Sequence, residues 1–155
     1  MSKRSICEGM IVAMEYAPNS KNVAEILCTS ITSSIKFHLP ESNFDLKALY
    51  AKLYLISDIL FNTSNPSLPL AWSYRKDFDF LLPQVFDALH SLSASKLQGL
   101  LSQKQLKKQA TRLLRLWREH QLYESRTLDG WEATLRVEHA KYYAYHLREA
   151  EFVPP

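Results

Sequence analysis

The stretch LYLISDILFNTS, residues 53–64, places polar groups inside an otherwise apolar helical pattern. A carboxylate in such a helix, here Asp58, must be paired, face an opening, or bind something. On a helix, an aromatic ring, a hydroxyl, a carboxylate and an amide gather on one strip, and an apolar strip faces the core. The polar strip comprises Tyr50, Tyr54, Ser57, Asp58 and Asn62, and the apolar strip comprises Leu49, Leu53, Ile56 and Leu60.

The polar strip is suited to binding an extended or turned peptide. Tyr54 would supply a stacking wall, and Asp58 and Asn62 would form hydrogen bonds with the peptide backbone and hydroxyls. The alternative is an internal network in which Asp58 accepts hydrogen bonds from a neighbouring helix. The residues of this stretch alone leave both interpretations open.

A basic stretch is the second feature that could bind a ligand. No Asp or Glu occurs from Ser91 to Arg118, and the cations of the helix expected there form a row beside its apolar seam. That row consists of Lys104, Lys108, Arg112 and Arg115. It is either a solvated helix face or a footprint for an anionic partner such as phosphopeptide, nucleic acid or lipid head group. RNA contact here would be secondary and would show a steep salt dependence.

The sequence contains no arrangement typical of an enzyme. The GxSxG, HExxH and Walker patterns are absent. His139 and His146 lie two turns apart on the expected last helix, but a metal site needs a third ligand and none is evident. We therefore expect a binding module, without cofactor or metal.

Helical periodicity runs through all 155 residues, which are enough for one domain with its own core. Only three glycines argue against a turn-rich β fold, and no apolar run approaches the roughly 20 residues that span a bilayer. Successive helices with short links predict an all-α bundle or right-handed superhelix. The expected helices cover residues 5–16, 19–40, 45–62, 72–92, 102–121 and 126–150, and Pro83 should kink or split the fourth.

The N-terminus lacks the apolar core of a signal peptide, so we expect an intracellular protein. Its two cysteines, Cys7 and Cys28, should be reduced and half-buried. We expect residues 1–155 to be a single domain that belongs to a longer, multidomain protein.

Three stretches resemble the CTD-interacting domain, a family that reads the phosphorylated heptad repeats (YSPTSPS) of the largest subunit of RNA polymerase II. LYLISDILFNTS resembles its signature helix, RSICEGMIVAMEYAPNSKNVAEIL its first two helices, and TRLLRLWREHQLY its helix with a central tryptophan followed by an aromatic residue. Within the family, LYLISDILFNTSNPSLPLAWSYRKDF is most similar to the U2 snRNP-associated SURP-motif splicing proteins. The resemblance covers nearly the whole chain and depends on the order and spacing of these motifs.

The resemblance implies a right-handed superhelix of about eight helices with a peptide groove. In the family, the SPTS part of the heptad forms a β-turn in that groove, and the signature aspartate, here Asp58, bonds the turn. The loop between the first two helices also lines the groove. The peptide-binding residues implied in this way are Asn19, Ser20, Lys21, Tyr54, Ser57, Asp58, Ile59 and Asn62.

The resemblance also implies a phosphate-binding wall. In some members, an arginine five residues before the tryptophan contacts the phosphate on the second serine, and Arg112 corresponds to it. Lys108 and Arg115 would raise the local positive potential. His120 stands where some members place a basic residue, and its charge would depend on pH.

The leading hypothesis is a nuclear, monomeric phosphopeptide-binding adaptor that couples splicing to transcription through the polymerase heptads. A spliceosomal scaffold that keeps the fold but binds another protein is the alternative. A third interpretation comes from the related superhelices of membrane-trafficking adaptors. The first helix is neither cationic nor amphipathic enough to insert into a bilayer, so we expect no membrane partner.

Overall fold

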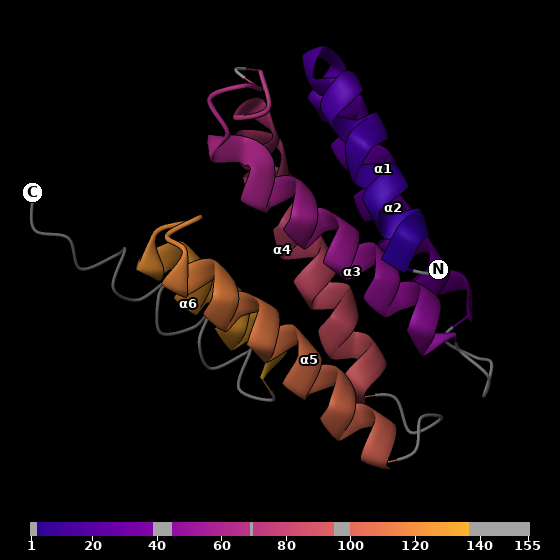
Figure 1. Ribbon diagram of the computed structural model, residues 1–155. Helices are drawn as coiled ribbons and strands as arrows, with labels where there is room; N and C mark the ends of the chain where they lie inside the picture. The colour runs from indigo at the N-terminus through magenta and orange to yellow at the C-terminus, as the bar shows by residue number, and fades with distance from the viewer. Residues whose placement is uncertain (1–2, 39–44, 69, 95–99, 137–155) are drawn as a thin grey trace, which may run out of the picture.

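The computed structural model describes residues 3–38, 45–68, 70–94 and 100–136. These residues form six α-helices and two short 3₁₀ turns, and no strand occurs among them (Figure 1). The helices are α1 (Lys3–Glu15), α2 (Ser20–His38), α3 (Leu46–Phe61), α4 (Ser73–Ala94), α5 (Leu100–Glu119) and α6 (Ser125–Leu135), and the turns are η1 (Ala17–Asn19) and η2 (Asn62–Ser64). The predicted all-α class is confirmed, although the described part of the chain contains fewer helices than the eight that were expected.

All six predicted helices are present, and each begins close to its predicted start. α4 runs unbroken from Ser73 to Ala94 with Pro83 inside it, so the prediction that the proline splits this helix is wrong. Packing of α4 against its neighbours therefore outweighs the lost helical hydrogen bond. Residues 137–150 of the last predicted helix, with His139 and His146, lie outside the described residues.

α3 is the most deeply embedded helix beside the candidate site. Asp45 caps its N-terminus by accepting a hydrogen bond from the amide of Ala48 at 3.2 Å. At its other end, the Asn62 side chain donates to the Asp58 carbonyl oxygen at 2.8 Å. The predicted apolar strip of this helix is buried as expected: Leu49, Leu53, Ile56 and Leu60.

α1 packs directly on α3 and runs beside it in the same direction (Figure 1). A Cβ added to Gly9 would lie 3.2 Å from each terminal methyl of Leu55, so the Leu55 side chain packs closely against the α1 backbone at this point. The Tyr74 hydroxyl of α4 donates to the Ala13 carbonyl oxygen at 2.5 Å and ties α1 to the rest of the molecule.

α5 is held by a cluster of aromatic side chains shared with α4 and α6. The rings of Phe86 and Trp131 stack with centroids 5.6 Å apart, and Trp131 meets Tyr123 edge to face at 4.9 Å. The buried Trp117 indole of α5 donates to the Ser57 hydroxyl of α3 at 3.0 Å. These contacts fix the rotation of α5, because its apolar seam must face α3, α4 and α6.

The two cysteines differ from the prediction. Cys28 is buried, and burial raises the pKa of its thiol to about 12. Cys7 is exposed on α1 instead of half-buried. The residue lies beside α3 but is not covered by it, so the thiol is left at the surface.

Candidate functional site

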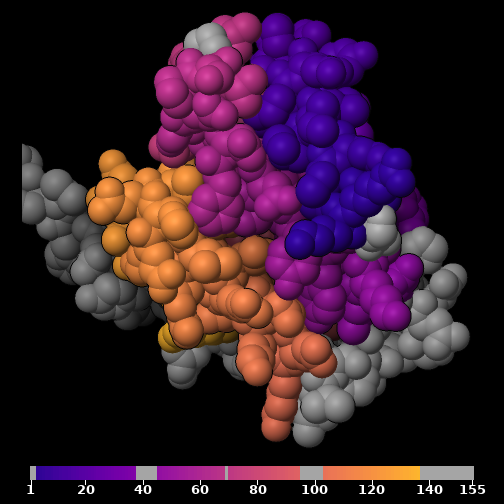
Figure 2. All heavy atoms as spheres, viewed as in Figure 1, coloured from indigo at the N-terminus to yellow at the C-terminus, as the bar shows by residue number. Residues whose placement is uncertain are grey.

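A groove of about 520 Å³ lies between α1 and α3. Figure 2 shows α1, α3 and α5 exposed next to one another on one face of the molecule. We call this hollow the α1–α3 groove. It is lined by Lys3, Ile6 and Cys7 of α1 and by Lys47, Tyr50, Ala51, Tyr54 and Asp58 of α3. Two of the predicted peptide-binding residues, Tyr54 and Asp58, therefore lie in one groove.

Tyr54 connects the groove to α5. Its side chain is 39% exposed, and its hydroxyl donates to the Gln109 side-chain oxygen of α5 at 3.0 Å. The bond fixes the orientation of the ring at the boundary between the groove and α5. A fixed aromatic ring of this kind offers a stacking surface with little conformational entropy to lose on binding.

Asp58 presents an unsatisfied carboxylate to the groove. The side chain is partly buried, and burial raises its pKa above the ordinary aspartate value. No described residue forms a hydrogen bond or an ion pair with the Asp58 carboxylate. The Asn62 side chain donates to the backbone carbonyl oxygen of Asp58 instead. The internal network that was the alternative interpretation is therefore absent from the described part of the chain. The carboxylate is available to accept hydrogen bonds from a ligand.

Two residues predicted for the groove belong to the core. Ser57 is 4% exposed, and its hydroxyl accepts the hydrogen bond from the Trp117 indole. Ile59 is fully buried. They lie on the sides of α3 that meet α5 and the core, and their predicted part in peptide binding remains a prediction.

Asn62 and the turn between α1 and α2 are also away from the lining of the groove. Asn62 caps α3 through the Asp58 carbonyl oxygen. Ser20 is buried, where its hydroxyl donates to the Asp77 carboxylate and accepts from the Ser73 hydroxyl at 2.8 Å. Asn19 and Lys21 are exposed beside it. This turn follows the C-terminal end of α1, whereas the groove uses the N-terminal half of that helix.

Arg112 is on α5 and is not among the residues that line the groove. It follows Gln109, the partner of Tyr54, by three residues on α5, so both side chains leave the helix on the same side. Lys108 and Arg115 lie farther round α5, toward solvent. All three are exposed, and none of them forms an ion pair with another described residue. The exposed basic row is thus not neutralised by other described residues, and Arg112 lies one turn from Gln109, the partner of Tyr54.

His120 follows the last turn of α5 and is exposed. Its ring meets Phe61 of α3 edge to face with centroids 4.8 Å apart. The contact joins the C-terminal ends of α3 and α5, which makes His120 a neighbour of the basic row but not part of the groove lining.

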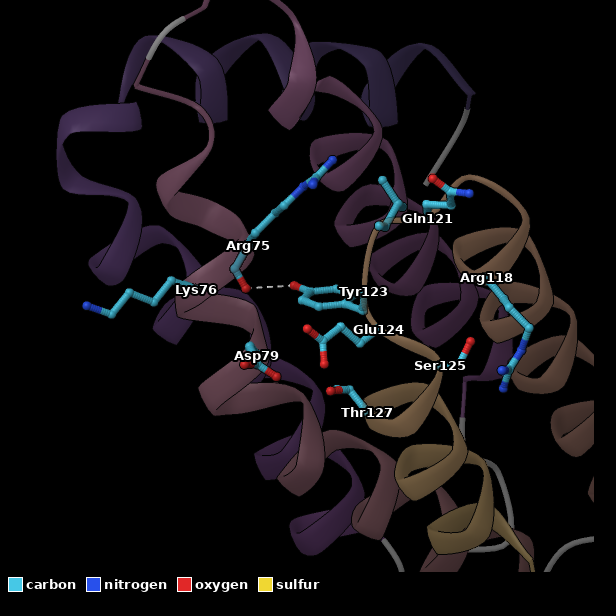
Figure 3. Close-up of a pocket in the computed structure, with 10 residues that line it drawn as sticks. Arg75, Lys76, Asp79, Arg118, Gln121, Tyr123, Glu124, Ser125 and Thr127 are labelled. Carbon is cyan, nitrogen blue, oxygen red and sulfur yellow. Dashed lines mark hydrogen bonds between the residues drawn. The ribbon is translucent and has the colours of Figure 1, made fainter.

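A larger hollow of about 730 Å³ lies between α4 and the segment that joins α5 to α6 (Figure 3). Figure 3 shows the carboxylates of Asp79 and Glu124 facing the same space. Two of its other groups are already engaged, because Tyr123 donates to the Arg75 carbonyl oxygen at 2.8 Å and Arg118 pairs with Asp129 at 2.6 Å. Two free carboxylates would repel a phosphorylated ligand, so this hollow is a poorer candidate than the α1–α3 groove.

The sequence did not identify most of the residues that line the groove. It did not identify Lys3, Ile6 and Cys7, which recur at helical spacing on α1, or Lys47 and Ala51 on α3. The spacing of Lys3, Ile6 and Cys7 was visible as one face of a helix. Nothing in the sequence tells which neighbour that face meets.

The described residues hold no group of three or more His, Cys, Asp or Glu side chains that could bind a metal ion. Within the same residues, no helix combines the length and apolar character needed to cross a membrane. An all-α domain with an open, tyrosine-lined groove, a free carboxylate and a basic neighbouring helix has the features of a peptide-binding module.

Comparison with protein families identifies the family to which this peptide-binding module belongs. The family model described as CID domain matches residues 1–131. The chain therefore belongs to the CID family. CID domains are protein-interaction domains, not enzymes, and they bind peptides of the RNA polymerase II C-terminal domain.

Proposed function

We propose that this domain is an adaptor that binds the phosphorylated heptad repeats of RNA polymerase II in the α1–α3 groove. The free Asp58 carboxylate beside the anchored Tyr54 ring is the observation that carries the proposal. The carboxylate accepts hydrogen bonds from the hydroxyl and amide groups of a turned SPTS segment. The Tyr54 ring packs against the proline or tyrosine of the heptad.

The phosphate specificity is assigned to Arg112. Its guanidinium is exposed, has no acidic partner among the described residues, and leaves α5 on the side of Gln109 and Tyr54. A planar guanidinium binds a phosphate through two parallel hydrogen bonds. Lys108 and Arg115 add positive potential from the solvent side of the helix, which speeds association more than it adds contacts.

The cellular role in the proposal is the coupling of splicing to transcription in the nucleus, by a protein related to the U2 snRNP-associated SURP-motif splicing proteins. The support is the order of motifs in LYLISDILFNTSNPSLPLAWSYRKDF. A heptad peptide must be ordered in order to bind, so a single domain binds weakly and repeated heptads add avidity.

Fluorescence anisotropy with labelled two-heptad peptides tests the proposal. The wild-type domain should bind a peptide phosphorylated at the second serine more tightly than the unmodified peptide. Asp58→Arg should abolish binding of both peptides, and Arg112→Gln should remove only the gain due to the phosphate. Charge-assisted hydrogen bonds of this kind contribute about 1.5–3 kcal/mol each, so that gain is about tenfold or more.

Lys36→Gln is the matched control, since it removes one exposed cation of α2 outside the groove. It should leave both affinities unchanged. Equal affinity of the wild type for modified and unmodified peptides would refute phosphate reading. Retention of peptide by Asp58→Arg would show that the groove is not the binding site and would favour a scaffold that uses another face.

A further inference from the structure

The two ends of the α1–α3 groove carry opposite charges. On α3 its lining residues recur at helical spacing from Lys47 through Tyr50 and Tyr54 to Asp58, a span of about 16 Å. α1 runs in the same direction, so Lys3, its first residue, lies at the Lys47 end (Figure 1). The groove therefore has two lysines at one end and a carboxylate at the other.

The cationic end is not neutralised within the described residues. Neither Lys3 nor Lys47 forms an ion pair there, while the neighbouring Arg4 is already paired with Glu8 at 3.0 Å. Asp45 is the nearby acid on α3, and its carboxylate accepts the hydrogen bond from the Ala48 amide. The N-termini of two parallel helices also meet at this end, and their dipoles add positive potential.

Tyr50, one turn from Lys47, is an independent sign of an unfilled subsite. Its ring lines the groove, yet its hydroxyl is closed off from solvent and has no hydrogen-bond partner. Burial, with a smaller contribution from Tyr54, raises the pKa of this phenol, so it remains a proton donor at neutral pH. A buried donor without an acceptor is unfavourable, and a ligand oxygen that reached it would relieve this.

The spacing fits a second phosphate on one peptide. Tyr54, whose hydroxyl bonds to Gln109 three residues before Arg112 on α5, is seven residues from Lys47, which is about 10 Å along the helix. An extended peptide covers that distance in about three to five residues. Serines of a repeated heptad YSPTSPS recur at such intervals.

We propose that Lys3, Lys47 and Tyr50 form a second phosphate subsite in the groove. It binds a phosphoserine about three to five residues from the one at Arg112. The inference rests on the proposed heptad binding. It makes the domain a reader of doubly phosphorylated peptide, with the two phosphates held by different helices.

The test compares three two-heptad peptides by fluorescence anisotropy: one unmodified, one phosphorylated at the second serine of the second heptad, and one phosphorylated also at the fifth serine of the first heptad. These two serines are four residues apart and do not share one turned SPTS segment. For the wild-type domain, the added phosphate should tighten binding by about tenfold. Lys3→Ser combined with Lys47→Ser should reduce this gain to about twofold or less and leave binding of the singly phosphorylated peptide intact. Lys36→Ser with Lys76→Ser, which changes the charge equally at two exposed positions on α2 and α4, should keep the full gain.

Tyr50→Phe is the second variant, because it keeps the ring and removes only the hydroxyl. It should lower the gain from the added phosphate without lowering the melting temperature, since the hydroxyl has no partner to lose. Circular dichroism verifies the fold of each variant. An undiminished gain in the double lysine variant would overturn the subsite alone. Failure of the wild type to bind any of the three peptides would overturn heptad binding itself.

Discussion

At the residue scale, Asp58 is placed where it lowers stability. It is partly buried, it begins the last turn of α3, and no described residue donates to its carboxylate. A negative charge near a helix C-terminus opposes the helix dipole, which typically costs about 0.3–1 kcal/mol. A residue placed against stability in this way is best explained by the ligand that it binds.

Asp58→Asn should therefore stabilise the free domain and weaken peptide binding. Burial raises the folded-state pKa of this carboxyl above its ordinary value of 3.8. The folded state then holds the proton more tightly than the unfolded state, so stability falls as pH rises through the folded-state pKa. Urea unfolding should show the variant more stable than the wild type at pH 7 by less than about 1 kcal/mol, because the side chain is partly exposed.

The advantage of Asp58→Asn should shrink as pH falls below about 4, where the wild-type carboxyl is protonated in both states. A wild-type domain that is more stable than the variant at pH 7 would instead indicate a hidden favourable partner for the carboxylate.

Ser57 has a structural role that its neighbour Asp58 does not share. Its buried hydroxyl is the acceptor for the Trp117 indole, so Ser57→Ala would leave a buried donor unsatisfied. We expect the free energy of unfolding to drop by about 1–3 kcal/mol, measured by urea denaturation followed through tryptophan fluorescence. Ser67→Ala, in an exposed loop, is the control and should change stability by less than about 0.5 kcal/mol. An unchanged midpoint for Ser57→Ala would show that water replaces the lost acceptor.

At the element scale, the width of the groove depends on how closely α1 approaches α3. Gly9 lies at that contact, although it does not line the groove. A side chain larger than alanine must displace the buried Leu55 or push the helices apart. The position of Lys3, Ile6 and Cys7 over α3 is thus set by a residue with no direct part in binding.

Gly9→Val should lower the free energy of unfolding by about 1–3 kcal/mol through overpacking, and should weaken heptad binding as α1 moves. Gly9→Ala is the control, because its better helix propensity of about 1 kcal/mol works against a contact at 3.2 Å. Peptide affinity and urea midpoints measure the two effects. If Gly9→Val is destabilised but binds the peptide as tightly as the wild type, the width of the groove does not determine binding.

At the scale of the whole molecule, the three helices around the site are held by different contacts. α1 depends on Gly9 and on the bond from Tyr74, whereas α5 depends on Trp117 and the aromatic cluster with α6. The groove and the basic row therefore belong to two packed units that meet at Tyr54 and Gln109. Together with the bond from the Trp117 indole to Ser57, that bond joins α3, which lines the groove, to α5, which carries the basic row.

Helical periodicity alone predicts the helices, the apolar strip of α3 and the placement of Tyr54 and Asp58 on one polar strip, because it assigns each side chain to a face of its helix. It also placed an acid-free basic row on α5. Periodicity could not tell that Ser57 and Ile59 are covered by other helices, since a face has no identity until a neighbour packs on it.

Which face of α1 packs on α3 follows from tertiary packing alone. Because of that packing, Lys3, Lys47 and Tyr50 share the groove with Asp58. These residues are far apart in sequence or looked like ordinary surface and core positions. Their proximity follows from the packing of the Leu55 side chain against α1 at Gly9, a contact between residues far apart in sequence that no local pattern records.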